Sequence, residues 1–410
     1  MARTDSISEL WNPLLPEQLA DPYPLYARAR REEPVFYSSR FDVWVVTRYA
    51  DILSVARDPD RFSSHNSLFT RAEPLPEVQA VLREGYEEFT SLVQSDPPDH
   101  TRVRAVFGKA FTPPRVAALE GRIRELTREH IDAFASDGHA DLVSQLALPL
   151  PAYIICDLLG VPRSDMQKLR AWHEDKHVLL SGHAPAAVQV EGARSHLAMQ
   201  RYFKAHIEAR AADPRDDLLT ILVPEAIGGA APLSMQAAVC NAMDLLAAGH
   251  ETATALITNG IDLLLAHPEA ARALREDREL LPGAIDEMLR FEPPVRGFFR
   301  KVTADAEVSG IRIPSGARVL LLYASGNRDE AEFPDGERFD IRRADAGKHL
   351  AFGKGIHFCV GSLLGRTEGR VAIEQLLDRL PGLRRGEGAA RRTESFGMRA
   401  FDSFPIAWDV

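Results

Sequence analysis

The sequence predicts a mainly α-helical fold with small β-sheets, of the α+β class. Apolar residues recur three and four positions apart through most of residues 102–264, which is the helical period. Short runs rich in β-branched and aromatic residues lie near both ends of the chain. The 410 residues are 45% hydrophobic and 26% charged, a composition typical of a globular protein that buries a large core.

The amino-terminal region predicts a β-hairpin and a helix. PVFYS at 34–38 and VWVV at 43–46 are β-rich runs with turn-forming residues between them. Apolar residues at helical spacing follow over 49–57, and the helix should end at the next Asp-Pro pair. Residues 62–94 mix proline, glycine and charge without a clear period, so we expect a long functional loop there.

Consecutive helices should follow, punctuated by proline and glycine. The longest is predicted over 234–266, about 33 residues and therefore about 50 Å long. Because it is apolar nearly all round, we expect it to lie buried in the core. After a helix that ends near Phe291, short strands are expected over 307–313 and 319–323.

The carboxyl-terminal region predicts a last helix from Cys359 to Leu380 and an alternating strand over 404–410. The chain has no internal repeat, low-complexity tract or Gly/Ser linker. We therefore expect one domain over 1–410. Its expected parts are a β-rich edge at about 34–47, a helix-rich body at about 100–380 and a β-hairpin at about 394–410.

Charge and cysteine content exclude several classes of protein. With 49 Lys+Arg against 59 Asp+Glu, the formal net charge is −10, which argues against nucleic-acid binding. Three widely spaced cysteines form neither a disulfide framework nor a CxxC metal clip. The polar amino terminus resembles neither a signal peptide nor a membrane anchor. We expect a cytoplasmic protein.

The segment FGKGIHFCVG at 352–361 carries the clearest chemical signal. Cys359 is expected at the mouth of the last helix, where unpaired backbone N–H groups stabilise a thiolate that can ligate iron. The glycines allow the backbone to approach a flat macrocycle closely, and Phe352 can pack on the sulfur side. The alternative for a lone cysteine is a buried structural residue in a tight turn.

This segment closely resembles the haem-binding signature of the cytochrome P450 family of haem-thiolate monooxygenases. The resemblance implies the fold of that family, with a long central helix and a carboxyl-terminal haem-thiolate loop. It also implies haem b (Fe-protoporphyrin IX) with the Cys359 thiolate as the axial ligand of the iron. Three further segments follow the family's order across nearly the whole chain.

The first is AGHET at 248–252, midway along the long helix. A glycine and a threonine are unusual inside a buried helix, so a local opening is expected. The resemblance implies an oxygen-activation groove in which Glu251 and Thr252 deliver protons to dioxygen. The alternative is a polar patch with Thr252 bonded to the backbone. Many family members carry a second threonine where this chain has Ala253.

The second segment is Glu287-Met288-Leu289-Arg290, with carboxylate and guanidinium on one helix face. In isolation this would be a solvated ion pair. It resembles the family's Glu-x-x-Arg element, which implies a buried structural cluster of Glu287, Arg290 and Arg338.

The third segment holds His100 and Arg104, four residues apart on an expected helix. The resemblance assigns both to the haem propionates, together with Arg300 and His357. The remaining cofactor contacts that it implies are Phe352, Ala248 and Gly361.

The implied function is insertion of one oxygen atom from O2 into a small, largely hydrophobic organic substrate by hydroxylation or O/N-dealkylation. Electrons would come from an external ferredoxin or flavodoxin-like donor and its reductase. The expected docking residues are Arg102, Lys109, Lys354 and Arg366, for which solvated surface charge is the alternative. The expected pocket residues are Leu245, Ala248, Val295, Phe298 and Phe401. The alternatives to a monooxygenase are a peroxide-using haem-thiolate peroxygenase and a non-enzymatic haem sensor or carrier.

Overall fold

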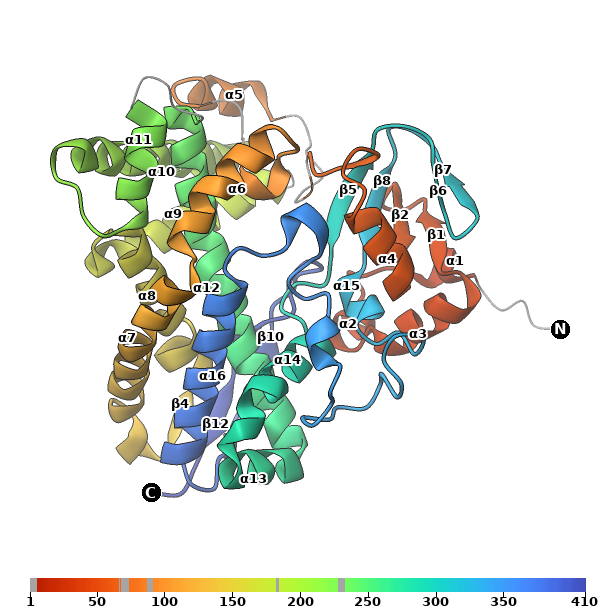
Figure 1. Cartoon of the computed structure of the whole chain (residues 1–410), viewed down its shortest axis with the longest axis vertical. Helices are drawn as coiled ribbons and strands as arrows, with labels where there is room; N and C mark the ends of the chain where they lie inside the picture. The colour runs from red at the N-terminus through yellow and green to blue at the C-terminus, as the bar shows by residue number, and fades with distance from the viewer. Residues whose placement is uncertain (1–5, 66, 68–73, 87–90, 182–183, 228–232) are drawn as a thin grey trace. The chain divides into compact units, whose positions relative to one another are not determined.

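The computed structural model describes residues 6–65, 67, 74–86, 91–181, 184–227 and 233–410. These residues form many helices and four small sheets, as the sequence predicts (Figure 1). The chain divides into two compact units. Unit 1 comprises Met1–Ser64, Ala118–Leu150 and Glu251–Val410, and unit 2 comprises His65–Ala117 and Pro151–His250.

Unit 1 contains the sheets and the carboxyl-terminal helices. Its elements are α1 (Ile7–Leu10), α2 (Pro16–Ala20), α3 (Tyr23–Glu32), β1 (Val35–Ser38), β2 (Val43–Val46), α4 (Tyr49–Ala56), β3 (Phe62–Ser63), η2 (Ala135–Asp137), β4 (His139–Asp141), η3 (Val143–Ala147), α13 (Pro268–Glu276), η5 (Arg278–Leu280), α14 (Leu281–Phe291), β5 (Phe298–Val302), β6 (Ala306–Val308), β7 (Ile311–Ile313), β8 (Arg318–Leu321), α15 (Tyr323–Gly326), η6 (Ala346–Lys348), η7 (Gly355–His357), α16 (Ser362–Arg379), β9 (Arg384–Arg385), β10 (Arg391–Arg392), β11 (Phe401–Ser403) and β12 (Pro405–Ala407).

Unit 2 is helical in the part of the chain that the structure describes. Its elements are α5 (Pro76–Leu82), η1 (Leu92–Gln94), α6 (Asp99–Ala110), η4 (Arg163–Asp165), α9 (Met166–Ser181), α10 (Ala186–Ala212) and α11 (Leu218–Ile227). Three helices have residues in both units: α7 (Pro113–Asp132), α8 (Pro149–Leu159) and α12 (Met235–Ala266).

The largest sheet has the strand order β1-β2-β8-β5-β3. Its hairpin β1–β2 is antiparallel with Val35 opposite Val46, which confirms the predicted hairpin. Side chains alternate between the two faces because successive residues of a strand point in opposite directions. Val46 and Leu321 join one hydrophobic cluster, whereas Val45 and Leu320 join another. Both faces of this sheet are therefore buried.

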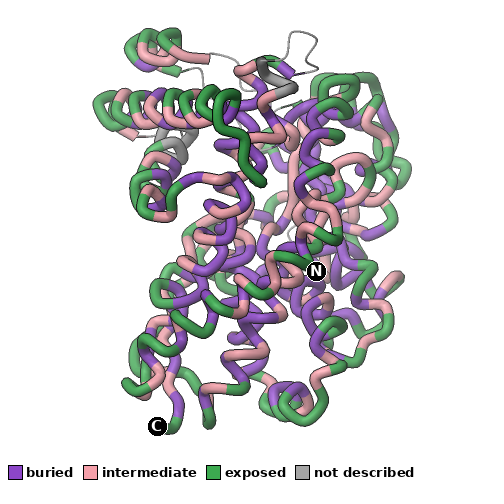
Figure 2. The backbone as a smooth tube through the Cα atoms, turned by 60° about the vertical axis from the view of Figure 1, so that its left-hand side comes forward, coloured by how far each residue is buried: buried purple, intermediate pink, exposed green. Residues whose placement is uncertain are grey.

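The long helix α12 confirms the prediction closely. Ser234 begins it by accepting the Ala237 N–H on its side-chain oxygen, 3.1 Å away, as a helix N-cap does. Most residues of the helix are buried; Figure 2 colours the whole described backbone by burial. It continues unbroken through 248–252, so the expected local opening is absent. Gly249 has a packing reason instead: an added Cβ would lie 2.7 Å from the Ile155 side chain of α8.

Three other expectations differ from the structure. Segment 62–94 contains β3, α5 and η1 rather than one long loop; its residues 66, 68–73 and 87–90 lie outside the described part. The last helix begins at Ser362, so Cys359 precedes it instead of starting it. The strands of segment 394–410 do not pair with each other, because β11 pairs with β10 whereas β12 lies between β4 and β9.

Candidate active site

The loop from Phe352 to Gly361 is held in a compact turn. The Cys359 amide donates to the Phe352 carbonyl oxygen at 2.8 Å, which closes the turn on the cysteine. Gly353 and Gly355 have φ angles of 67° and 70°, a region that favours glycine. A Cβ on Gly355 would also lie 2.2 Å from the Ala56 carbonyl oxygen. This glycine is therefore required by both conformation and space.

Cys359 differs from the other two cysteines in exposure. Cys156 and Cys240 are buried, whereas Cys359 is partly exposed. Burial raises the pKa of the Cys156 thiol to about 12, so that sulfur stays a thiol. Among the described residues, no group of three or more His, Cys, Asp or Glu side chains is placed to hold a metal ion. A single accessible thiol can serve a haem, because the macrocycle itself supplies most of the ligands of its iron.

Two predicted propionate donors of unit 1 lie in or near this loop. His357 lies within the loop, and its Nε2 atom lies 2.7 Å from the Ser64 hydroxyl. Arg300 on β5 is buried, its Nη1 atom donates to the Phe299 carbonyl oxygen at 2.7 Å, and its charge acts on the Tyr323 hydroxyl. The Tyr323 hydroxyl is 3.7 Å from the point where a Gly353 Cβ would lie, so Tyr323 connects Arg300 with the cysteine loop. Burial raises the pKa of Tyr323, and Arg300 opposes that shift.

His100 and Arg104 lie four residues apart on α6, in unit 2. His100 is buried and Arg104 is half-buried. Their placement at the haem stays a prediction.

The middle of α12 has an accessible stretch. Residues 237–243 and 253–261 are buried, but Ala248 is exposed and Leu245, Glu251 and Thr252 are half-buried. Two residues beyond Thr252, the Thr254 hydroxyl donates to the Ala147 carbonyl oxygen at 2.8 Å. The helix therefore presents a carboxylate and a hydroxyl at an accessible position within an otherwise buried stretch.

The predicted pocket residues of unit 1 lie on two different segments. Val295 forms a β-bridge with Met398, which the sequence reasoning missed because an isolated bridge has no sequence pattern. Phe298 on β5 is half-buried, and its ring centroid lies 6.1 Å from that of Tyr323. Phe401 on β11 is buried, with its ring packed against Phe404.

The buried Glu287–Arg290 pair is confirmed, but its second arginine differs from the prediction. Arg290 contacts both Glu287 carboxylate oxygens, at 2.6 and 2.8 Å, and both side chains are 0% exposed. Arg338 is exposed and contributes only its carbonyl oxygen, which accepts from Arg290 at 3.0 Å. The second guanidinium is that of Arg343, 3.5 Å from Glu287. The assignment of Arg338 is therefore corrected to Arg343.

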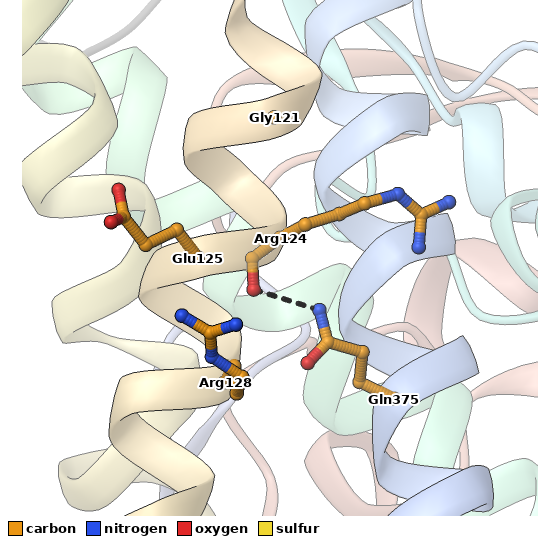
Figure 3. Close-up of a pocket in the computed structure, with 5 residues that line it drawn as sticks. All are labelled: Gly121, Arg124, Glu125, Arg128 and Gln375. Carbon is orange, nitrogen blue, oxygen red and sulfur yellow. Dashed lines mark hydrogen bonds between the residues drawn. The ribbon is translucent and has the colours of Figure 1, made fainter.

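A polar groove of about 430 Å³ lies between α7 and α16, lined by Gly121, Arg124, Glu125, Arg128 and Gln375 (Figure 3). Gln375 crosses it by donating to the Arg124 carbonyl oxygen at 2.9 Å. The groove shares no residue with the predicted site.

Among the helices of the described residues, none combines the length and the hydropathy that a membrane span requires.

Several known proteins are similar to this chain. A family model described as Cytochrome P450 matches residues 36–381. The monooxygenase PikC of Streptomyces venezuelae is 41% identical over 372 residues, which cover 89% of this chain and 85% of PikC. The vitamin D(3) 25-hydroxylase of Pseudonocardia autotrophica is 38% identical, covering 94% of this chain and 93% of its own. A solved structure of cytochrome P450 CREJ in complex with (4-ethylphenyl) dihydrogen phosphate superimposes with a TM-score of 0.89 at 34% identity, covering 95% of this chain and 98% of CREJ.

Proposed function

Since this chain belongs to the cytochrome P450 family of monooxygenases, we propose that it inserts one oxygen atom from O2 into a small, largely hydrophobic organic substrate. The observation that carries the proposal is the accessible Cys359 in its hydrogen-bonded turn. Haem-thiolate ligation is general in this family, and the turn suits it because the cysteine amide is already paired with Phe352.

The Cys359 thiolate would hold the iron of haem b. When bound, the haem would supply dioxygen activation, which electron donation from the thiolate sulfur would promote. Gly361, which precedes α16, and Phe352 lie on the same loop and would pack against the macrocycle. Arg300 and His357 are the donors of unit 1 for the two propionates, and we assign His100 and Arg104 to them as well.

Glu251 and Thr252 are assigned to proton delivery. Both side chains belong to the accessible stretch of α12, where a carboxyl group can pass a proton to a neighbouring hydroxyl. Correct delivery directs the reducing equivalents into substrate oxidation, whereas faulty delivery releases hydrogen peroxide. Ala248 precedes them on the helix and would face the haem.

The substrate is proposed to contact Leu245, Ala248, Val295, Phe298 and Phe401, which are all apolar. One relative is named vitamin D(3) 25-hydroxylase. None of the five positions carries a charge, which fits a largely hydrophobic substrate.

Electrons are proposed to come from a ferredoxin or a flavodoxin-like protein with its reductase. Of the four expected docking residues, Lys109 is exposed on α6 and Arg102 pairs with Asp99 at 3.4 Å. Lys354 is half-buried, and burial lowers its pKa. Arg366 is already engaged with Asp286.

The test compares two sources of oxidising power. The purified holoenzyme should oxidise an apolar test substrate with NAD(P)H, a surrogate ferredoxin and its reductase, and label from 18O2 should enter the product. Turnover that is faster with hydrogen peroxide than with the reductase would favour a peroxygenase. A holoenzyme that oxidises no member of an apolar substrate panel by either route would favour a haem sensor or carrier.

A further inference from the structure

Three polar side chains beside the cysteine loop contact one another, and the proposed chemistry uses none of them. Arg366 on α16 donates through Nε to Oδ1 of Asp286 on α14, at 2.7 Å. The Nε2 atom of His349 lies 3.4 Å from the same oxygen. We call Asp286, His349 and Arg366 the Asp286 cluster. Asp286 thus links two helices to the residues that lead into the loop.

The hydrogen bonds of the imidazole determine its protonation. The Ala351 backbone N–H donates to His349 Nδ1 at 3.1 Å, so Nδ1 must be the acceptor and the ring proton sits on Nε2, facing Asp286. His349 is buried, and this burial lowers its pKa while Asp286 opposes the shift. The neutral tautomer therefore connects Asp286 to the loop backbone.

Asp286 stays ionised in this position. Burial acts to raise its pKa, but the hydrogen bonds from His349 and Arg366 outweigh burial and hold the pKa below its ordinary value. Gly347 approaches the other carboxylate oxygen, which a Cβ would meet at 3.3 Å. The carboxylate is therefore confined by three neighbours.

The cluster also holds the Phe352 ring. The Arg366 guanidinium lies 4.6 Å from the ring centroid, a cation–π distance. The His349 ring centroid lies 5.5 Å from that of Phe352. The carbonyl oxygen of Phe352 accepts the Cys359 N–H, so movement of Phe352 would disturb the turn at the cysteine.

We propose that Asp286 is a positioning residue for the thiolate: through Arg366 and His349 it fixes Phe352 and thereby the hydrogen-bonded turn at Cys359. The inference rests on the proposed function, in which the Cys359 sulfur binds the haem iron. In this inference, Arg366 holds the cysteine loop in place through Asp286 and Phe352 and does not bind the redox partner. Loss of the Asp286 charge should loosen the turn. The Cys359 thiolate would then take up a proton from water more readily and become a thiol.

The test uses the Asp286→Asn variant of the holoenzyme, which keeps size but removes charge. In the reduced, carbon-monoxide-bound variant, the Soret band should lose its red shift about tenfold faster than in the wild type. A tenfold change in rate corresponds to the free energy of about one charge-assisted hydrogen bond. The haem reduction potential should also change. The matched control is Asp132→Asn. Asp132 is the exposed carboxylate that pairs with Arg379, another arginine of α16. Control and wild type should behave alike in both measurements.

A second variant, Arg366→Gln, covers the case in which Asp286→Asn fails to bind haem. It removes the guanidinium that contacts Asp286 and the Phe352 ring but leaves the His349 contact in place. Its loss of red shift should therefore be faster than in the wild type. Equal rates and equal potentials for wild type, Arg366→Gln and the control would overturn the inference. A wild-type band without the red shift would instead refute the proposed function, so the two failures are distinguishable.

Discussion

At the scale of residues, the roles of Gly249, Asp286 and His349 depend on contacts that the sequence alone does not show. Gly249 was expected to mark a helix opening, but it accommodates Ile155 within an unbroken helix. Cys359 and its loop were predictable because a glycine-rich turn with one cysteine has a local pattern. Asp286 and His349 were not, since their roles depend on a contact between segments 63 residues apart.

Thr252 provides the prediction at this scale. In Thr252→Ala, NAD(P)H consumption should continue while hydrogen peroxide released per NAD(P)H rises about tenfold, because the proton donor to dioxygen is lost. Peroxide and product are measured together in the reconstituted system. Thr258→Ala is the control, since the Thr258 hydroxyl donates to the Thr254 carbonyl oxygen at 2.9 Å within the same helix. Unchanged coupling in Thr252→Ala would contradict the assignment.

At the scale of elements, the segment after β8 is fastened to α14 by Arg290 and Glu287. The Arg290 guanidinium donates to the carbonyl oxygens of Asn327 and Gly336, each at 2.8 Å, and Glu287 accepts the Asp340 N–H at 2.8 Å. The sequence predicted the pair on α14, since three-residue spacing places both groups on one helix face. It could not identify the second arginine, because irregular segments have no period.

Two variants test whether Arg343 or Arg338 is the second arginine beside Glu287. Arg343→Gln should lower the free energy of unfolding by about 1–3 kcal/mol, because it removes a guanidinium beside the buried Glu287 carboxylate. Arg338→Gln should change it by about 0.5 kcal/mol or less, because that side chain is exposed. Urea unfolding of both holoenzymes provides the comparison. A larger loss in Arg338→Gln would restore the original assignment.

At the scale of the whole molecule, the fold class and most helices were predictable because helical periods are local. The sheet partners were not: β12 at the end of the chain pairs with β4, with Ile406 opposite Ala140. The three residues of β4 carry no strand pattern, so only the pairing itself defines this strand. The register of such long-range pairs is set by packing rather than by neighbouring residues.

The stability of the molecule should depend on a buried acid, Glu368 on α16. Burial raises its pKa from 4.5 to about 8, and within the described residues its Oε1 atom has no hydrogen-bond partner. Between these two values the folded chain binds more protons than the unfolded chain, so stability falls as pH rises. Glu368→Gln should remove this decrease in the free energy of unfolding, which is on the order of 3–5 kcal/mol.

Thermal unfolding of the holoenzyme at pH 5 and at pH 8.5 measures the effect of Glu368. The variant should gain stability relative to the wild type at the higher pH only. Glu276→Gln, at an exposed position of α13, should keep the wild-type pH dependence. An identical pH dependence in Glu368→Gln and the wild type would show that this carboxyl group does not titrate as described.

The measurement that tests the central claim most directly is the absorption spectrum of the dithionite-reduced, carbon-monoxide-bound holoenzyme. The account predicts a Soret band with the red shift of thiolate ligation in the wild type, and its loss in Cys359→Ser. A wild-type band without that shift, or a red-shifted band that survives in Cys359→Ser, would contradict the assignment of Cys359 as the axial ligand.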